Sequence, residues 1–395
     1  MNVEFKQFIK QMNTGPREWH NPIIFDFTNE DHLNQAEALY KSGQITTSVD
    51  NLKTITADLF NVMHPNILQP YSESGLAIRD NFMDTYQRDD IEYGKWVFFP
   101  WLDQLVHYPS KEHHQLLRTA RNRELVTSEE QARLLEANIG VFGLSVGSRV
   151  CESLVISGIG GTYVLGDTDS ISSTNLNRIS GSVADLDETK ISKVAKNVSL
   201  TDPYVEQIHF PEGFTDGFSS NQRLSIIVDE VDDLKSKVGM RIFARENGIA
   251  LIMATDIGDS SIIDIERYDQ GYEEPFHGKI KEKDLERISS GDFTDVEKRK
   301  YLAKLIGLSN VSARLISSMT EQEVTLSGIP QLANTAVIGG GLVAIASREI
   351  LLGRTMKSGR YVLKTKNILG MKSPTGKIET AKIFLDALKA IKSDN

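Results

Sequence analysis

The chain has 395 residues, 40% of them hydrophobic, and a formal net charge of −10, so it can bury a sizeable core in one main domain and a smaller one. The negative charge argues against a nucleic-acid partner, because such binding depends on lysine and arginine at the phosphates. Residues 1–15 lack the apolar core of a secretory signal, no stretch is apolar enough to span a membrane, and there is one cysteine, so we expect a cytoplasmic protein.

The N-terminal third, residues 1–115, is expected to form a mixed, mainly helical accessory domain. Apolar residues recur at helical spacing in 33–40 and 52–63. The segment Trp96-Val-Phe-Phe-Pro-Trp101 is typical of a strand that enters a turn. No motif in this region indicates a particular chemistry.

A glycine-containing turn follows an apolar strand. Residues 139–142 have the length and β-branched content of a buried strand, and 148–156 have apolar residues at helical spacing. Small residues at such a turn let the backbone approach a phosphate, while the N–H groups and the dipole of the following helix attract its charge. We therefore expect the triphosphate of a nucleotide to bind at Gly143, Ser145, Gly147 and Ser148.

The next predicted strand, 162–165, is followed by an aspartate. Asp167 lies twenty residues after Gly147, and an acid at about 20 residues from the glycine turn is where a Rossmann-type unit holds the ribose hydroxyls. The spacing therefore predicts Asp167 as the ribose ligand.

The same turn also matches G-x-S-x-G, the nucleophile elbow of the α/β-hydrolases, with Ser145 as the nucleophile. A hydrolase triad needs an acid and then a histidine after the serine, but only His209 and His277 follow Ser145. A serine hydrolase therefore stays as a less favoured alternative. A Rossmann unit that holds NAD or FAD is weaker still, because it leaves the cations described next without a role.

Four polar motifs follow in order. They read Asp167-Thr-Asp169, Asn175-Leu-Asn-Arg178, Asp187-Glu-Thr-Lys190 and Asp229-Glu-Val-Asp232. This series resembles the ThiF/MoeB superfamily of ubiquitin-activating-enzyme-like adenylyltransferases, which share a D-x-D, an N-L-x-R, a lysine in a G-x-x-K turn and a strand that ends in D-x-x-D. Asp187 replaces the usual turn glycine. The resemblance covers about 118–368 and points to a zinc-free branch of bacterial ThiF-like proteins.

The resemblance implies that a carboxylate attacks the α-phosphorus of ATP, which forms an acyl-adenylate and releases pyrophosphate. Two anions must approach each other, so cations have to neutralise both. Arg178 can bind phosphate oxygens with its planar fork, and Lys190 offers a compact charge for the α-phosphate. Asp232 would hold Mg²⁺ opposite the phosphates, with Asp229 and Asp233 as lesser candidates.

Other residues enter the ATP site through the same resemblance. Asp169 belongs to the D-x-D pair, and Asn175 is either a loop-fixing or phosphate-side amide or only a turn residue. Arg118, Arg121 and Arg123 stand where the family has an arginine that reaches into the neighbouring subunit's ATP site, and Arg121 and Arg123 are our candidates. The alternative for them is a solvated basic helix end. An arginine supplied across an interface implies a homodimer.

Cysteine usage narrows the expected mechanism. Cys151, on the helix after the glycine turn, is the single cysteine of the chain, and a small buried side chain is its ordinary role. Without a C-x-x-C pair we expect no zinc, and without a cysteine in the later crossover region we expect no thioester step. The expected partner is a carboxylate substrate, which could be a peptide, a carrier protein's C-terminus or a small acid.

These observations predict an α/β fold, a Rossmann-like, mostly parallel sheet with helices on both faces, together with the smaller N-terminal region and a helical insertion. The adenylation domain is expected at 116–370 and the insertion, with alternating charges at helical spacing, at about 279–322. Residues 371–395 are expected to form a tail helix. A catalytically silent nucleotide-binding scaffold of the same fold is the alternative function.

Overall fold

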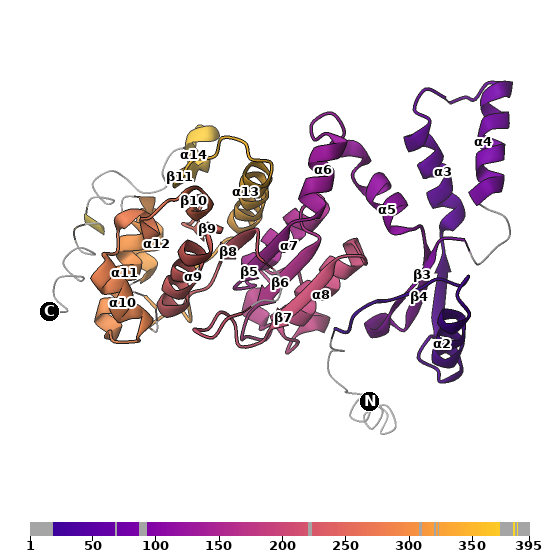
Figure 1. Ribbon diagram of the computed structural model, residues 1–395. Helices are drawn as coiled ribbons and strands as arrows, with labels where there is room; N and C mark the ends of the chain where they lie inside the picture. The colour runs from indigo at the N-terminus through magenta and orange to yellow at the C-terminus, as the bar shows by residue number, and fades with distance from the viewer. Residues whose placement is uncertain are drawn as a thin grey trace. The chain divides into compact units, whose positions relative to one another are not determined.

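The structure is a computed structural model that describes residues 19–67, 69–86, 93–219, 223–307, 310–319, 321–322, 324–371, 382–383 and 385. The chain divides into two compact units, of which the first comprises Met1–Ala132, Ile156–Gly158 and Ala195–Val205 and the second comprises the remainder. Figure 1 colours the elements in chain order. The tail helix expected at 371–395 lies almost entirely outside the described residues.

The first unit contains a four-stranded mixed sheet in the order β1-β3-β4-β2, together with several helices. In β3, Trp96 and Phe98 belong to one apolar cluster and Val97 and Phe99 to another, because successive side chains of a strand point to opposite faces. Both faces of this strand are therefore covered. The elements are β1 (Ile23–Phe25), α2 (Glu30–Lys41), β2 (Thr47–Asp50), α3 (Leu52–Met63), α4 (Glu73–Tyr86), β3 (Lys95–Phe99), β4 (Gln104–Tyr108) and α5 (Lys111–Arg118).

The second unit contains a seven-stranded sheet in the order β11-β10-β9-β8-β5-β6-β7. Strands β5 to β9 pair in parallel, whereas β10 is antiparallel to both of its neighbours. The predicted α/β fold with a mostly parallel sheet is thereby confirmed. The strands are β5 (Asn138–Phe142), β6 (Thr162–Gly166), β7 (Glu206–Phe210), β8 (Ile226–Asp229), β9 (Ala250–Asp256), β10 (Ser260–Arg267) and β11 (Gly359–Lys364).

Helices cover both faces of this sheet, as predicted. Phe142 of β5 packs with Met240 of α9, while its neighbour Val141 faces Gly147 of α7 on the opposite side. Helix α13 packs against α7 on the same face of the sheet. The two backbones are so close that a Cβ placed on Gly340 would lie 2.6 Å from the Arg149 carbonyl oxygen. These helices and their neighbours are α6 (Ser128–Leu135), α7 (Gly147–Ile156), α8 (Lys190–Thr201), α9 (Leu234–Asn247), α13 (Ala333–Leu351) and α14 (Thr365–Ile368).

The segment after β10 is helical where the sequence predicts the insertion. It contains α10 (Glu282–Ser289), α11 (Asp295–Ile306) and α12 (Ala313–Met319), shown in orange in Figure 1. Leu285 and Ile288 of α10 and Leu305 of α11 pack with Leu234 and Val238 of α9, so the insertion shares an apolar cluster with a helix of the sheet. Within the described part of the chain, no helix is both long and apolar enough to cross a membrane.

Candidate functional site

The candidate site lies at a point where the direction of strand addition reverses. From β5 the chain adds β6 and β7 on one side, and then adds β8, β9, β10 and β11 on the other. In open α/β sheets, ligands bind in the crevice at the carboxyl ends of the strands at such a switch point. Gly143, Asp167 and Glu230 each follow directly after one of these ends, and Asp256 is the last residue of β9.

The turn between β5 and α7 depends on a glycine. Gly143 has a φ of 86°, in the left-handed region, and donates from its N–H to the Gly166 carbonyl across 2.8 Å. A Cβ at this position would lie 2.6 Å from the Val231 nitrogen, so a larger residue cannot be accommodated without a shift of the backbone. The helix then begins at Gly147, and the N–H of its third residue, Arg149, donates to the Val146 carbonyl at 2.9 Å. The N–H groups at the very start of a helix generally lack intrahelical partners. Such a helix start is suited to an anion.

The turn is stabilised by the predicted ribose ligand. Asp167 accepts from the Leu144 N–H at 2.6 Å and from the Asp169 N–H at 2.8 Å, one bond at each carboxylate oxygen. Its side chain is 7% exposed. Ser148, also buried, donates to the Ser145 carbonyl at 2.8 Å. Asp167 therefore connects the end of β6 to the glycine turn, while Asp169 is the more exposed acid of the pair.

Lys190 begins α8 and faces the D-x-D pair. Its Nζ lies 2.7 Å from an oxygen of Asp169 and 3.6 Å from one of Asp167. The hydrogen bond from Lys190 lowers the pKa of Asp169. Asp187, which stands where the family has glycine, adopts a φ of 69°. The left-handed turn before the lysine is thus formed by an aspartate, a residue type that tolerates this conformation better than most.

Arg178 is oriented by its own loop and by the glycine turn. Its Nε donates to the Ser145 hydroxyl at 2.9 Å, and one terminal nitrogen donates to Asn177 Oδ1 at 3.0 Å. Burial lowers the pKa of Arg178, and the negative charges of Asp232 and Asp256 oppose that effect. Asn175 accepts from the Ser172 N–H at 3.1 Å, which makes it a cap of the loop's short helical turn.

Three aspartates, one at the end of β8 and two shortly after it, differ sharply in their surroundings. Asp229 is fully buried and lies 2.6 Å from Arg241 and 3.0 Å from Lys237. Asp233 caps α9 by accepting from the Ser236 N–H at 2.7 Å. Asp232 is exposed and has no hydrogen bond to any residue that the structure describes. Asp232 and Asp233 are both exposed, and of the three carboxylates that of Asp232 is the one without a hydrogen bond to a described residue.

The described residues contain no group of three or more His, Cys, Asp or Glu side chains arranged to hold a metal ion. Mg²⁺ at a nucleotide site is commonly held by only one or two carboxylates together with phosphate oxygens. A single carboxylate in the position of Asp232 fits that donor set.

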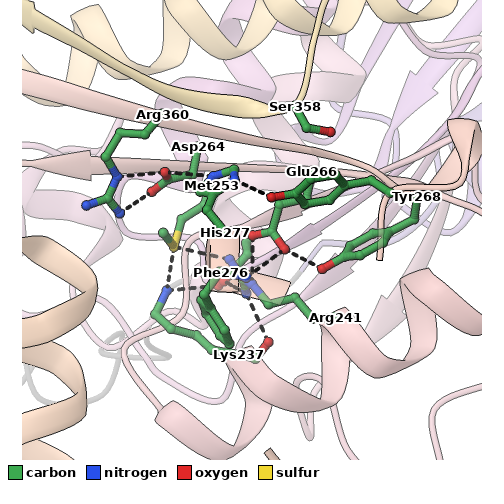
Figure 2. Close-up of polar contacts among 12 residues, drawn as sticks. Lys237, Arg241, Met253, Asp264, Glu266, Tyr268, Phe276, His277, Ser358 and Arg360 are labelled. Carbon is green, nitrogen blue, oxygen red and sulfur yellow. Dashed lines mark hydrogen bonds and ion pairs between the residues drawn. The ribbon is translucent and has the colours of Figure 1, made fainter. Parts of the chain in front are cut away.

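A buried ionic network joins α9 and β10 (Figure 2). The Arg241 guanidinium lies 3.0 Å from Glu266 and stacks over the Phe276 ring at 3.8 Å from its centroid. Two residues before Glu266 on β10, Asp264 accepts from Arg360 and from His277 Nε2, the latter at 3.1 Å. Burial would raise the pKa of Asp264, but these two partners outweigh it and hold the pKa at about 2. These side chains are occupied by one another and so have a structural role.

Two carboxyl groups at the site were not singled out by the sequence. Glu230 accepts from the Ala254 N–H at 2.9 Å, and burial raises its pKa well above the usual value. Asp256 ends β9, and burial raises its pKa to about 6, against the attraction of Arg178. Asp256 follows the apolar run 250–254, so the rule that selected Asp167, an acid at the end of an apolar strand, could have found it.

The upstream arginines belong to the first unit, whereas the other candidate residues belong to the second. Arg121 and Arg123 are exposed, and Arg123 donates to the Val62 carbonyl at 3.3 Å. Arg118 instead forms an ion pair at 2.9 Å with the buried Asp202.

Neither alternative nucleophile has the surroundings that its chemistry requires. Cys151 is buried, and burial raises the pKa of its thiol. Among the described residues, the Ser145 hydroxyl has Arg178 as its hydrogen-bond partner and no histidine. His277, the later of the two histidines that could complete a triad, bonds Asp264 and Tyr272.

Two curated proteins are similar to this chain over part of their length. An uncharacterized protein of Mycobacterium tuberculosis, MT1398, is 34% identical over 274 residues, which are 68% of this chain and 38% of that protein. The tRNA threonylcarbamoyladenosine dehydratase of Haemophilus influenzae is 30% identical over 167 residues, 40% of this chain and 63% of that protein. The chain thus spans less than two thirds of either relative.

Among solved structures, Escherichia coli MccB with MccA-N7isoASN aligns with a TM-score of 0.41 at 14% identity, covering 79% of this chain and 84% of that one. The model of the ThiF family matches residues 118–382, more than half of the chain. On that match, this protein belongs to the ThiF family.

Proposed function

We propose that the protein is an ATP-dependent adenylyltransferase that activates a carboxylate as an acyl-adenylate and releases pyrophosphate. The observation that carries the proposal is the hydrogen bond of 2.9 Å between Arg178 and Ser145, which holds a cation directly over the glycine turn. Lys190, beside the D-x-D pair, supplies a second cation at the end of the neighbouring strand. Membership of the ThiF family supports the same assignment.

In the proposed reaction, a carboxylate oxygen of the substrate forms a bond to the α-phosphorus of ATP, and the bond from that phosphorus to the pyrophosphate oxygen breaks. Negative charge grows on the phosphate oxygens and on the leaving group. Arg178 and Lys190 stabilise this charge, and such positioned cations contribute most of the rate in phosphoryl-type transfer. Mg²⁺ held by Asp232 would neutralise the leaving pyrophosphate.

The remaining residues are assigned to ATP binding. The backbone from Gly143 to Gly147 and the Ser148 hydroxyl would accommodate the phosphates, because the helix start supplies N–H donors there. Asp167 or the more exposed Asp169 would bind the ribose hydroxyls, and Asn175 would keep the Arg178 loop in shape. Arg121 or Arg123 would reach this site from a second copy of the chain, which requires a homodimer. Size-exclusion chromatography with light scattering can test whether the chain forms one.

We further propose that no thioester forms, because the single thiol, Cys151, is buried inside α7. The activated carboxylate would then pass directly to an acceptor. The activated carboxylate would belong to a peptide, a carrier protein or a small acid. The Haemophilus relative is named for a modified tRNA nucleoside, so such a nucleoside should also be tested.

ATP–pyrophosphate exchange tests the proposal. The assay compares wild type, Lys190→Ala and Asp232→Ala with Mg²⁺, against pools of small acids, peptides and cell extract. Lys193→Ala is a matched control, because Lys193 lies on the same helix and pairs with Asp185. Exchange that needs one pool and is lost in the first two variants supports adenylation; ATP binding without exchange would favour the silent scaffold, and absence of ATP binding refutes the proposal.

A further inference from the structure

Arg149, near the start of α7, is hydrogen-bonded to the backbone of the loop that carries Arg178. Its Nε donates to the Arg178 carbonyl at 2.9 Å, and one terminal nitrogen donates to the Ile179 carbonyl at 3.4 Å. The other terminal nitrogen donates to Glu152, on the same helix, at 2.8 Å. A planar guanidinium has its donors in a fixed fork and can serve several acceptors at once. Every nitrogen of the Arg149 side chain is therefore engaged by a protein group.

One short stretch of chain thus holds Arg178 at two points. Ser145, in the glycine turn, accepts from the side chain of Arg178, and Arg149, four residues later, donates to its backbone carbonyl. Ser145 and Arg149 flank Gly147, where α7 begins and where the phosphates of the proposed nucleotide would bind. The position of the cation relative to this helix start is therefore set at both the head and the base of its side chain.

Arg149 is itself held firmly in place. Its side chain is only 24% exposed, and Gly340 of α13 packs against its carbonyl oxygen. Glu152, its ion-pair partner, also accepts from the Ser180 hydroxyl at 3.4 Å. Two residues of α7 are therefore bonded to consecutive residues of the Arg178 loop, so the loop and the helix form one support.

We propose that Arg149 is a positioning residue for adenylation, which holds the backbone of Arg178 so that its guanidinium meets the phosphates in one geometry. This inference rests on the proposed function. A misplacement of about 1 Å at a reacting group can cost about 100-fold in rate. A residue that does not touch ATP can therefore control kcat through the residue that does.

A direct contact between Arg149 and a phosphate fits the structure less well. The charge of Arg149 is paired with that of Glu152, and its remaining donors are used by the two loop carbonyls. A phosphate would have to displace these acceptors. Arg178 has no such carboxylate partner at hydrogen-bond distance among the described residues, because its donors go to Ser145, Asn177 and a backbone carbonyl.

The first test is ATP–pyrophosphate exchange with Mg²⁺ and the carboxylate pool that supports it. Arg149→Met removes the donors and keeps a long side chain, so kcat should fall about 10- to 100-fold while the KM for ATP changes little. Arg149→Lys keeps the charge but lacks the fork, so it should recover only part of the loss. Arg133→Met is the matched control, because it removes one bond to a backbone carbonyl, that of Leu351, and should leave kcat unchanged.

A double-mutant cycle separates positioning from general support of the fold. Arg149→Met is combined with Arg178→Met and with Lys190→Ala, and slow variants are measured in a single turnover with enzyme in excess. If Arg149 acts through Arg178, its replacement should change the rate less than about 2-fold when Arg178 is absent. The full effect should remain when Lys190 is absent, because the second cation does not depend on the Arg178 loop.

A measurement on the protein without ATP or substrate does not depend on activity. The Nε–H of Arg178 can be observed by nuclear magnetic resonance in protein with isotope-labelled arginine and identified by its absence from Arg178→Met. Its bond to Ser145 should protect it from exchange with water. Arg149→Met should speed that exchange about 10-fold and Arg133→Met should not. Ser145→Ala, which removes the acceptor, gives the upper limit.

Three results would overturn the inference. One is a folded Arg149→Met protein with the kcat and the Arg178 Nε–H protection of wild type. Another is an equal fractional loss of kcat with and without Arg178, which indicates support of the fold. The third is a rise in the KM for ATP that Arg149→Lys fully reverses, which indicates a direct phosphate contact.

Arg149→Lys takes the place of Arg149→Met in each comparison if the methionine variant does not fold. If wild type binds ATP but exchanges with no carboxylate, the proposed function fails. The protection of the Arg178 Nε–H then still decides whether Arg149 orients Arg178.

Discussion

Arg178 and Ser145 are joined by a hydrogen bond of 2.9 Å in which the guanidinium donates and the hydroxyl accepts. Ser145, which matches the nucleophile of the hydrolase motif, is thus a hydrogen-bond acceptor for Arg178. Arg178 reaches the turn from a loop that follows β6, whereas Ser145 follows β5. The contact therefore connects two neighbouring strand ends of the sheet.

Replacing Ser145 by alanine should weaken adenylation without abolishing it. The variant loses one charged hydrogen bond that orients Arg178, so kcat for ATP–pyrophosphate exchange should fall by about 10-fold while the KM for ATP changes little. Steady-state exchange kinetics measure both values. Complete loss of activity, together with ester hydrolysis by wild type, would instead indicate a nucleophilic serine.

Replacing Gly143 by alanine should damage the nucleotide site. A Cβ there would lie 2.6 Å from the Val231 nitrogen, in a left-handed backbone conformation that alanine disfavours. We expect ATP affinity, measured by calorimetry, to fall at least about 10-fold, since a shift of only about 1.4 kcal/mol suffices. Gly217→Ala is the control, because nothing lies within 4 Å of its Cβ position. Unchanged affinity in Gly143→Ala would contradict the assignment of the turn.

Replacing Arg241 by methionine should destabilise the protein strongly. Asp229 and Glu266 would keep their buried charges without the cation between them, and breaking such a pair costs about 3–5 kcal/mol in the free energy of unfolding. Urea unfolding measures the change. Arg245→Met, on the same helix, removes a more exposed pair with Glu282 and should cost less than about 1 kcal/mol. Similar losses in both variants would argue against the burial of the network.

Replacing Asp256 by asparagine should change how stability depends on pH. Burial raises the pKa of Asp256 from 3.8 to about 6, so between these values the folded protein holds a proton that the unfolded chain has lost. Stability at this site therefore falls as the pH rises through that window and stays low above it. The asparagine side chain does not titrate, so the variant lacks this loss. Its free energy of unfolding, relative to that of wild type, should therefore be about 2 kcal/mol higher at pH 8 than at pH 4.

Thermal or urea unfolding at pH 4, 6 and 8 measures the difference between the two proteins. Wild type without added substrate is the reference. A difference that is the same at all three pH values would show that the carboxyl group of Asp256 titrates normally.

Local patterns predicted the strand at 139–142 and the glycine turn after it, because each lies within a short segment whose geometry depends on neighbouring residues. The roles of the D-x-D pair and of Lys190 came from the family resemblance and stay predictions. The three aspartates at and after the end of β8, Asp229, Asp232 and Asp233, could not be ranked in this way. Asp229 is distinguished by Arg241, twelve residues later on the facing side of α9. Lys237 and Arg241 are four residues apart, so on a helix they lie on the same face. This spacing is a signal in the sequence that both cations face one acid.

The buried environment of Asp256 lies beyond such local inference. It forms because Gly339, on a helix far along the chain, packs against the ends of β9 and β10. The four-stranded sheet of the first unit also depends on contacts between distant segments, because β2 pairs with β4 across a stretch that contains α3, α4 and β3. Contacts of this kind depend on tertiary packing, which a single sequence does not display.

The backbone around Arg178 is held on both sides. Arg149 donates to the Arg178 carbonyl at 2.9 Å, and Asn177 donates to the Gln331 carbonyl at 2.9 Å. Reorientation of the guanidinium toward a phosphate therefore requires rotation about side-chain bonds alone, which occurs within nanoseconds, and not the slower rearrangement of a loop. A nucleotide bound as proposed would therefore meet the cation without any change in the loop.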